Sequence, residues 1–238
     1  MVDTHSKTII ESRELYEKCR SVAVIDHHRK LVEYIDNATI FYHEPYASSA
    51  CEMVTELVQY LSGNIRLTRL EAEALLAGIM LDTKNFVSKA GVRTFEAAAY
   101  LRKRGANTLT VKGMFSDNIE TYREKVDIVC KAHVYRGCAI SIAPSGDGDI
   151  RLASAQAADE MLNLKGVDAS FVLFEDNSQI NISARSYGNV NVQIIMEKLG
   201  GGGHQTMAAT QLKNTTKELA YQQLLSEIDN TLDDEENS

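Results

Sequence analysis

The 238-residue chain is 44% hydrophobic and 24% charged, and its formal net charge is −8. This composition is typical of a globular protein with one large or two modest domains, and the acidic balance argues against binding long nucleic acid on a basic face. A small phosphorylated ligand remains compatible with it. The sequence contains neither a signal-peptide pattern nor an apolar run near the roughly 20 residues of a membrane-spanning helix, so we expect no membrane contact by this chain.

The four cysteines, Cys19, Cys51, Cys130 and Cys138, show no C-x-x-C spacing. A chain of this length with so few cysteines is not typical of a disulfide-stabilised secreted protein. We therefore expect reduced thiols and a cytoplasmic location.

The first 115 residues alternate between strand and helix patterns. Ser48 or Ser49 can cap one helix, and Thr68 with Glu71 three residues later forms a capping box at the start of another. The alternation predicts an α/β domain built on a mostly parallel sheet. In chain order, we expect a helix over 11–18, strands over 21–25 and 38–42, and helices over 50–61, from 68 through 81 and over 94–104.

Residues 116–135 are charged and helix-forming, and Gly137 follows them. We expect one long helix that links two domains, with a surface helix of a single domain as the alternative. Farther along, we expect a hairpin over 138–143 and 150–153, a second over 169–174 and 179–184, a helix over 192–199, a strand, and a last helix over 218–232. The predicted organisation is an α/β domain over 1–115, a linker helix over 116–137, a smaller α+β domain over 138–232 and a disordered acidic tail over 233–238.

Three ionisable side chains, Asp26, His27 and His28, stand where the first buried strand ends. Ligands of open α/β sheets bind outside the carboxyl ends of strands, and a carboxylate with two imidazoles suits a divalent cation. Asp3 and Asp82 also end apolar segments of the same domain, where an unpaired carboxylate is costly. We therefore expect the three segments to meet at one metal site; the alternative is a solvated charged turn with unrelated surface aspartates.

Four consecutive glycines, 200–203, directly precede His204. Glycines in a row are costly to order, and they are used where backbone amides approach a ligand closely, most often a phosphate. His204 and Arg185 could add charge-assisted hydrogen bonds to it. A flexible linker between helix and strand is the alternative, but the apolar helix and strand on both sides favour ligand binding.

These motifs together resemble those of the DHH phosphoesterase superfamily. The run 24–29 is similar to its Asp-His-His signature, 2–4 to its second motif and 78–83 to its fourth. Residues 183–186 and 201–204 resemble the substrate domain associated with it. The run 191–200 is similar to that of the cyclic-di-AMP phosphodiesterases of the GdpP type.

The resemblance implies a manganese-dependent phosphodiesterase with two ions that hydrolyses cyclic-di-AMP to the linear dinucleotide. Asp3, His27 and Asp82 would be metal ligands, His28 would face the scissile phosphate, and Asp26 would orient a histidine ring. From the second domain, the substrate would be bound by Ser183, Arg185, Gly201, Gly202, Gly203 and His204. Full-length relatives of this type are membrane-anchored, and a homodimer is left open.

The superfamily's first motif, His-x-x-x-Asp-x-Asp, does not occur in this sequence. Because that motif supplies further metal ligands, the chain resembles a C-terminal fragment, and we expect weak metal binding and impaired activity. An oligoribonuclease or a bisphosphonucleotide phosphatase of the same superfamily is one alternative. A nucleotide-binding module without catalysis is another, from a different class.

Overall fold

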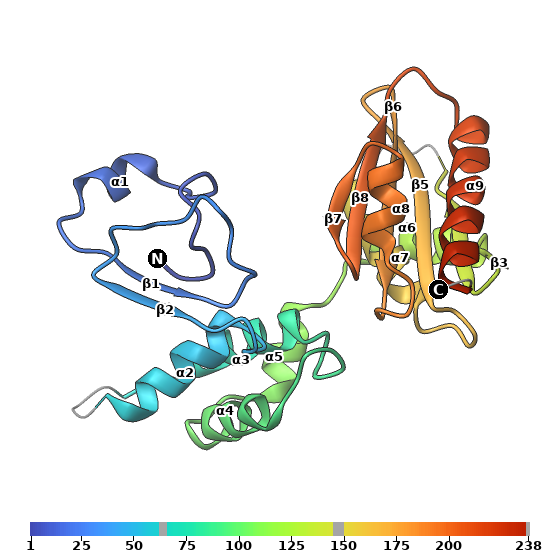
Figure 1. Cartoon of the computed structure of the whole chain (residues 1–238). Coiled ribbons are helices and arrows are strands. Elements are labelled where there is room, and N and C mark those ends of the chain that lie inside the picture. The colour runs from blue at the N-terminus through green and yellow to red at the C-terminus, as the bar shows by residue number, and fades with distance from the viewer. Residues whose placement is uncertain (62–65, 145–149, 237–238) are drawn as a thin grey trace. The chain divides into compact units, whose positions relative to one another are not determined.

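The computed structural model describes residues 1–61, 66–144 and 150–236. The chain divides into two compact units, Met1–Ser116 and Asp117–Ser238, each with its own hydrophobic cores (Figure 1). None of the helices in the described ranges has the length and hydropathy needed to cross a lipid bilayer.

The first unit contains a small parallel sheet. Strand β1 (Ala23–Asp26) pairs in parallel with β2 (Ile40–His43), so that Asp26 lies opposite His43. On the other edge of β1, Val2 forms a parallel bridge with Ile25. The short helix α1 (Arg13–Lys18) connects the N-terminal segment to β1. The expected parallel arrangement is confirmed, and it brings the N-terminal segment and the end of β1 side by side.

Among its described residues, the first unit also contains the helices α2 (Ala50–Tyr60), α3 (Arg69–Asp82), α4 (Val92–Lys103) and α5 (Thr108–Met114). Their ends follow local chemistry. The Ser49 hydroxyl accepts a hydrogen bond from the amide of Glu52, and Thr68 and Glu71 form the expected capping box. Apolar residues of α3, α4 and α5 and of the α4–α5 connection share one core: Ala72, Leu76, Ile79, Ala97, Leu101, Ala106 and Val111.

The second unit is a six-stranded mixed sheet in the order β3-β4-β5-β6-β8-β7. Helices α6 and α7 pack on one face, and α8 and α9 pack on the other (Figure 1). The strands are β3 (His133–Tyr135), β4 (Cys138–Ile142), β5 (Ala169–Asp176), β6 (Gln179–Ser186), β7 (Gly202–His204) and β8 (Met207–Leu212). The helices are α6 (Ile119–Cys130), α7 (Ile150–Met161), α8 (Val192–Lys198) and α9 (Lys217–Glu236).

The β5–β6 hairpin, which was expected, shows how alternation builds two cores. Asn177 and Ser178 form a two-residue turn with φ of +51° and +58°, the left-handed conformation that such hairpins require. Along β5, Phe171 and Leu173 face α8 and α9, whereas Val172 faces α6 and α7. Both faces of the strand are therefore buried.

The prediction that residues 150–153 form a strand pairing back on 138–143 is wrong. They form the first turn of α7, and β4 pairs in parallel with β5 instead. Parallel neighbours need a crossover, and α7 supplies it. The helical spacing was present in the sequence, since the buried residues of α7 are Ala153, Ser154, Ala157, Ala158 and Met161. The turn predicted to join these two segments, over 144–148, lies outside the described residues except for Pro144.

The helix expected over 116–135 is shorter than predicted. It ends at Cys130, and His133–Tyr135 forms the strand β3, joined to β4 by a turn at Arg136 and Gly137. Gly137 thus makes a hairpin turn instead of ending a helix. At the other end of the chain, the tail predicted to be disordered from 233 is helical through Glu236, and Asp233 forms an ion pair with Arg136.

Candidate metal centre and nucleotide-binding face

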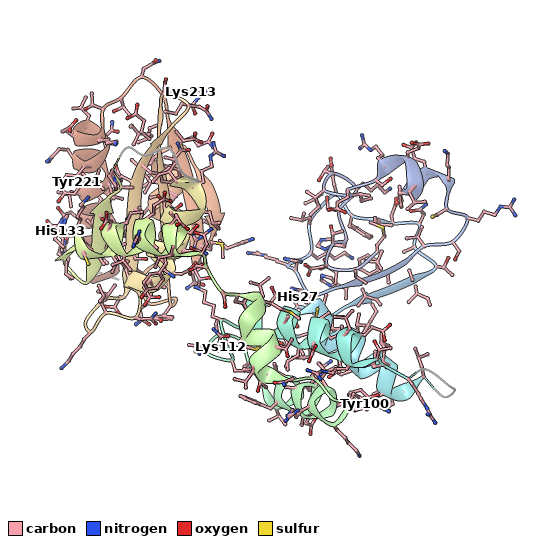
Figure 2. The ribbon with its side chains drawn as sticks, turned by 180° about the vertical axis from the view of Figure 1, so that it is seen from behind. His27, Tyr100, Lys112, His133, Lys213 and Tyr221 are labelled. Atoms are coloured by element: carbon pink, nitrogen blue, oxygen red, sulfur yellow. The ribbon has the colours of Figure 1, made fainter. Side chains whose placement is uncertain are left out.

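Three segments of the first unit place Asp3, His27 and Asp82 next to one another. His27 follows the last residue of β1, and Asp3 follows the residue that bridges to that strand. Asp82 is the last residue of α3. The Nε2 atom of His27 lies 3.4 Å from Oδ1 of Asp3 and 3.7 Å from Oδ2 of Asp82. Figure 2 shows His27 where the strands of this unit meet its helices.

The ring of His27 is oriented by the backbone. Its Nδ1 atom lies 3.3 Å from the carbonyl oxygen of Ala47. A carbonyl oxygen can only accept, so Nδ1 carries the proton and donates it. In the neutral ring, Nε2 is then left with its lone pair, which is directed at the two carboxylates.

This donor set fits a divalent cation. A bare imidazole nitrogen and two carboxylates present only lone pairs to one another, and they repel unless a positive charge lies between them. Two donors that are each about 2.1 Å from one cation lie roughly 3–3.4 Å apart, close to the observed spacing. Asp3, His27 and His28 also present ligand atoms that all lie within 4.8 Å of one another.

Asp26 organises the two histidines that follow it. Its carboxylate is fully buried, and Oδ1 accepts hydrogen bonds from the His27 amide at 2.9 Å and from His28 Nδ1 at 2.8 Å. Burial alone would raise the pKa of this carboxyl group, but hydrogen bonds from His5 and His28 outweigh burial and hold its pKa below the usual range. The side chain of His28 is 51% exposed, so it remains accessible to a ligand.

Asp82 is held in a different electrostatic setting. Partial burial raises the pKa of its carboxyl group, and the nearby Asp3 carboxylate raises it further, while His27 acts in the opposite direction. The adjacent thiol of Cys51 has its pKa raised to about 11, first by burial and then by the Asp82 and Asp3 carboxylates. Negative charge therefore accumulates here, as expected of a site that receives a cation.

The turn after Asp82 is strained. Lys84, Asn85 and Phe86 are three consecutive non-glycine residues with φ of +48°, +58° and +67°. The buried hydroxyl of Thr83 holds the turn, since it donates to the carbonyl of Ile79 at 2.6 Å and accepts from the amide of Phe86 at 2.9 Å. The turn fixes the direction in which the chain leaves Asp82.

Sequence reasoning missed two histidines of this region. His5 is 2% exposed and hydrogen-bonds to Asp26, and Nε2 of His43 lies 2.6 Å from the carbonyl oxygen of His28. Ligand atoms of His5, Asp26 and His43 lie within 4.8 Å of one another, but they are engaged in these hydrogen bonds. The register of β2 against β1, which sets His43 beside Asp26, was the signal that only the structure could supply.

In the second unit, four of the six predicted substrate residues lie in two cross-strand rows of the sheet, and Gly201 and Gly203 lie outside these rows. Ser183 of β6 lies opposite Ala209 of β8, which pairs with Gly202 of β7. Paired residues of neighbouring strands point to the same side of a sheet. Ser183 pairs with Val172 of β5, which packs against α6 and α7, so this row lies on the sheet face that these two helices cover. Toward β7 this face is open, because Ala209 is exposed.

The second row runs from Arg185 to His204 through Met207, which is 48% exposed. Arg185 is only 8% exposed. Its Nε atom lies 3.3 Å from Oδ2 of Asp159, and Nη1 donates to the carbonyl of Ala184. The structure therefore places Ser183, Arg185, Gly202 and His204 on one face, with the guanidinium already oriented by an acid.

The glycine segment has reasons within the fold for most of its members. Gly200 ends α8 with φ of +77°, and its amide and that of Gly201 bond back to Glu197 and Met196. A Cβ atom on Gly201 would lie 2.2 Å from the carbonyl oxygen of Ala209, and one on Gly203 would lie 2.5 Å from the backbone of β8. For these two, the closely approaching group is strand β8. A Cβ atom added at Gly202 would meet open space. The same holds at Gly200, but the positive φ of Gly200 disfavours any other residue there.

The first unit is a parallel strand layer that ends in clustered carboxylates and imidazoles, and the second is a mixed sheet with a tetraglycine segment. Together they define a two-domain α/β protein with candidate site residues in each unit. Residues 1–79 match the DHH family, N-terminal domain, and residues 137–234 match the DHHA1 domain. The chain therefore belongs to the DHH family, and the resemblance noted from its motifs is confirmed.

Two curated relatives cover nearly the whole chain. It is 45% identical over 231 residues to the cyclic-di-AMP phosphodiesterase PdeA of Listeria monocytogenes serotype 1/2a (strain 10403S) and 42% identical over 233 residues to GdpP of Bacillus subtilis (strain 168). Each match covers 96% of this chain but 35% of the relative, so the chain spans about a third of their length.

One solved structure supports the fold. An exopolyphosphatase-related protein from Bacteroides fragilis superposes with a TM-score of 0.79 at 21% identity. The match covers 94% of this chain and 69% of that protein.

Proposed function

We propose that this chain is the catalytic region of a divalent-metal-dependent phosphodiesterase that hydrolyses cyclic-di-AMP to the linear dinucleotide. The observation that carries the proposal is the convergence of Asp3, His27 and Asp82, from three separate segments, within 3.4 and 3.7 Å of the same imidazole nitrogen. The 45% and 42% identity to proteins named for this activity supports the substrate.

In this proposal, Asp3, His27 and Asp82 bind the cation, with manganese as the expected metal and two ions in a complete site. A bound divalent cation supplies a water of nearly neutral pKa and offsets charge on the phosphate. The Ala47 carbonyl keeps His27 in the tautomer that directs Nε2 inward. His28 faces the scissile phosphate, and Asp26 holds its ring in place.

The second unit binds the nucleotide in this proposal. Gly202 offers a half-buried backbone and His204 an exposed imidazole, and Ser183 and Arg185 lie on the same face of the sheet. A guanidinium already oriented by Asp159 can receive a phosphate without much loss of side-chain entropy. Gly201 and Gly203 contribute by letting β7 lie close against β8.

The test is manganese-dependent cleavage followed by chromatography. Cyclic-di-AMP, a short linear diadenylate and 3′,5′-bisphosphorylated adenosine are compared at equal concentration, and we expect the cyclic dinucleotide to be cleaved fastest. His27→Ala should abolish cleavage, whereas Glu96→Gln, which changes an exposed carboxylate on α4, should not. Faster turnover of either linear substrate would instead assign the chain to the oligoribonuclease or phosphatase activity.

We further propose that the chain by itself binds the cation weakly and turns over slowly, since the sequence contains only part of the ligand set that the family resemblance implies. Calorimetry separates this from a binding module without catalysis. Cyclic-di-AMP binding that needs no manganese and survives His27→Ala, with no cleavage at any metal concentration, would favour the module.

A further inference from the structure

We propose that His5 is a positioning residue, which fixes the tautomer and direction of the His28 imidazole by anchoring the carboxylate between them, Asp26. This inference rests on the proposed function, in which His28 faces the phosphate ester. It adds a residue to which the sequence motifs gave no role.

His5 is held from both ends of its ring. The backbone amide of Leu31 lies 2.9 Å from Nε2, and an amide can only donate, so Nε2 carries a lone pair. The proton of the neutral ring is then on Nδ1, which hydrogen-bonds to Oδ2 of Asp26. The His43 ring packs against the imidazole in a T-shaped arrangement, with 5.2 Å between the ring centroids, and only 2% of His5 is exposed.

Anchoring one oxygen of a carboxylate aims the other. With Oδ2 of Asp26 bonded to His5, rotation of the carboxylate would leave a fully buried, charged oxygen without its hydrogen-bond partner, which is unfavourable. Oδ1 therefore stays directed at Nδ1 of His28, 2.8 Å away. His28 must then carry its proton on Nδ1.

The consequence falls on the opposite side of the His28 ring. With Nδ1 engaged, Nε2 is the nitrogen left for a cation or a phosphate ester, and in the other tautomer it would present an N–H in place of a lone pair. His43 supports the same geometry, since its Nε2 lies 2.6 Å from the His28 carbonyl oxygen. His5 and His43 thus hold the side chain and the backbone of His28, respectively.

Two substitutions of His5 separate its two hydrogen bonds. His5→Asn keeps an N–H donor close to the position of Nδ1 and loses the acceptor for Leu31. His5→Gln places its amide at the position of Nε2 and loses the donor to Asp26. His133→Gln, at an exposed histidine of the second unit that hydrogen-bonds to Tyr221, is the matched control; both residues are labelled in Figure 2.

The readout is long-range ¹H–¹⁵N correlation of the histidine rings in the full, metal-free chain at pH 8.5, about two units above the ordinary imidazole pKa. We expect wild type, His5→Asn and His133→Gln to show His28 with its proton on Nδ1. In His5→Gln a second population with the proton on Nε2 should appear. Manganese affinity should fall by about ten-fold or more in His5→Gln and by less than three-fold in His5→Asn.

The wild-type spectrum tests the proposal even if a variant fails to fold, because the proposal requires the Nδ1–H form of both His5 and His28. A proton on Nε2 of either ring in wild type, or an unchanged His28 tautomer in folded His5→Gln, would overturn the proposal. If the tautomers behave as expected but cyclic-di-AMP is not cleaved, the proposed function fails and the positioning role of His5 stands.

Discussion

At Asp26 one carboxylate, fully buried, serves three neighbours: the His5 ring, the His27 amide and the His28 ring. Its burial would be unfavourable without these donors, since an uncompensated buried charge costs several kcal/mol. The charge is therefore compatible with the fold only because the histidines point inward to it. The same contacts that make Asp26 tolerable also orient the residues that we propose to be catalytic.

Thr83 provides a prediction at the same scale. Thr83→Val removes a buried hydroxyl, leaving the Phe86 amide without its acceptor at the start of the strained turn. We expect this change to destabilise the first unit by about 1–3 kcal/mol and to weaken manganese binding through Asp82. Urea denaturation, monitored by hydrogen–deuterium exchange in peptides from α3, measures the stability of the first unit. Calorimetry measures the manganese affinity.

Thr83→Ser is the control, because it keeps both hydrogen bonds and loses only a methyl group, at about 1 kcal/mol. Its metal affinity should match that of wild type. A valine variant with the metal affinity of wild type, or a serine variant that loses as much affinity as the valine variant, would contradict the role given to the hydrogen bonds of the hydroxyl.

The cysteines allow a test of the electrostatic description. Burial, and then the Asp168 carboxylate, raise the pKa of Cys138 to about 12, whereas Cys19 and Cys130 are exposed. Only the thiolate reacts with iodoacetamide, and at pH 8 a group of pKa 12 is about one ten-thousandth thiolate. We expect Cys138 to be alkylated at least ten-fold more slowly than Cys19 or Cys130, and peptide mass spectrometry measures each rate. Comparable rates in the native chain would contradict the buried placement of β4.

The sequence allowed Asp3, His27 and Asp82 to be grouped because each ends an apolar segment, and the structure brings them together. His5 and His43 were not recognisable, since neither follows a spacing rule. Their contacts depend on the loop that brings Leu31 to His5 and on the parallel register of β1 and β2. Residues that support a site through tertiary contacts leave little trace in the sequence around them.

Within the elements, backbone proximity explains the tetraglycine segment better than flexibility does. Strand β7 can pair with β8 only if no side chain intervenes at Gly201 and Gly203. At Gly203 the φ of +148° adds a second restriction. A segment that resembles a flexible linker by composition is therefore part of the sheet.

Alanine substitutions separate packing from ligand binding in this segment. We expect Gly201→Ala and Gly203→Ala to destabilise the second unit by about 1–3 kcal/mol or more, because the added methyl group collides with the β8 backbone. Gly202→Ala should leave stability within about 1 kcal/mol of wild type and reduce cyclic-di-AMP affinity, measured by calorimetry. A stable Gly202→Ala variant with unchanged affinity would remove Gly202 from the proposed nucleotide site.

The elements that could be predicted are those with strong local signals. The capping box at Thr68 was predicted, and so was the hairpin of β5 and β6, although its turn was expected over 175–177 and lies at Asn177 and Ser178. The start of α7 was misassigned because the four residues Ile150–Ala153 taken alone fit either period, and the helical spacing becomes clear only over the whole of α7. The seven-residue helix α5 was missed because it is too short to show a periodic pattern.

Across the whole molecule, the two candidate sites belong to two units with separate cores. Carboxylates and imidazoles gather in the first unit, and the sheet face that carries the buried Arg185 and opens toward β7 lies in the second. Each unit can therefore respond to its own ligand, because a ligand stabilises the part of the chain that forms its site.

Hydrogen–deuterium exchange of the full chain tests this division. At a free manganese concentration of about 100 times its dissociation constant, binding stabilises the unit that holds the ion by about 2.7 kcal/mol, which slows exchange through opening of that unit by about 100-fold. We expect this slowing in peptides from β1 and the end of α3 and none in those from β5 and β6. Asp82→Asn should abolish it, while Asp127→Asn, which alters an exposed carboxylate of α6, should leave it intact. Slowing that survives Asp82→Asn, or slowing in the β5 and β6 peptides without slowing in those from β1, would place the cation elsewhere and contradict the proposed metal centre.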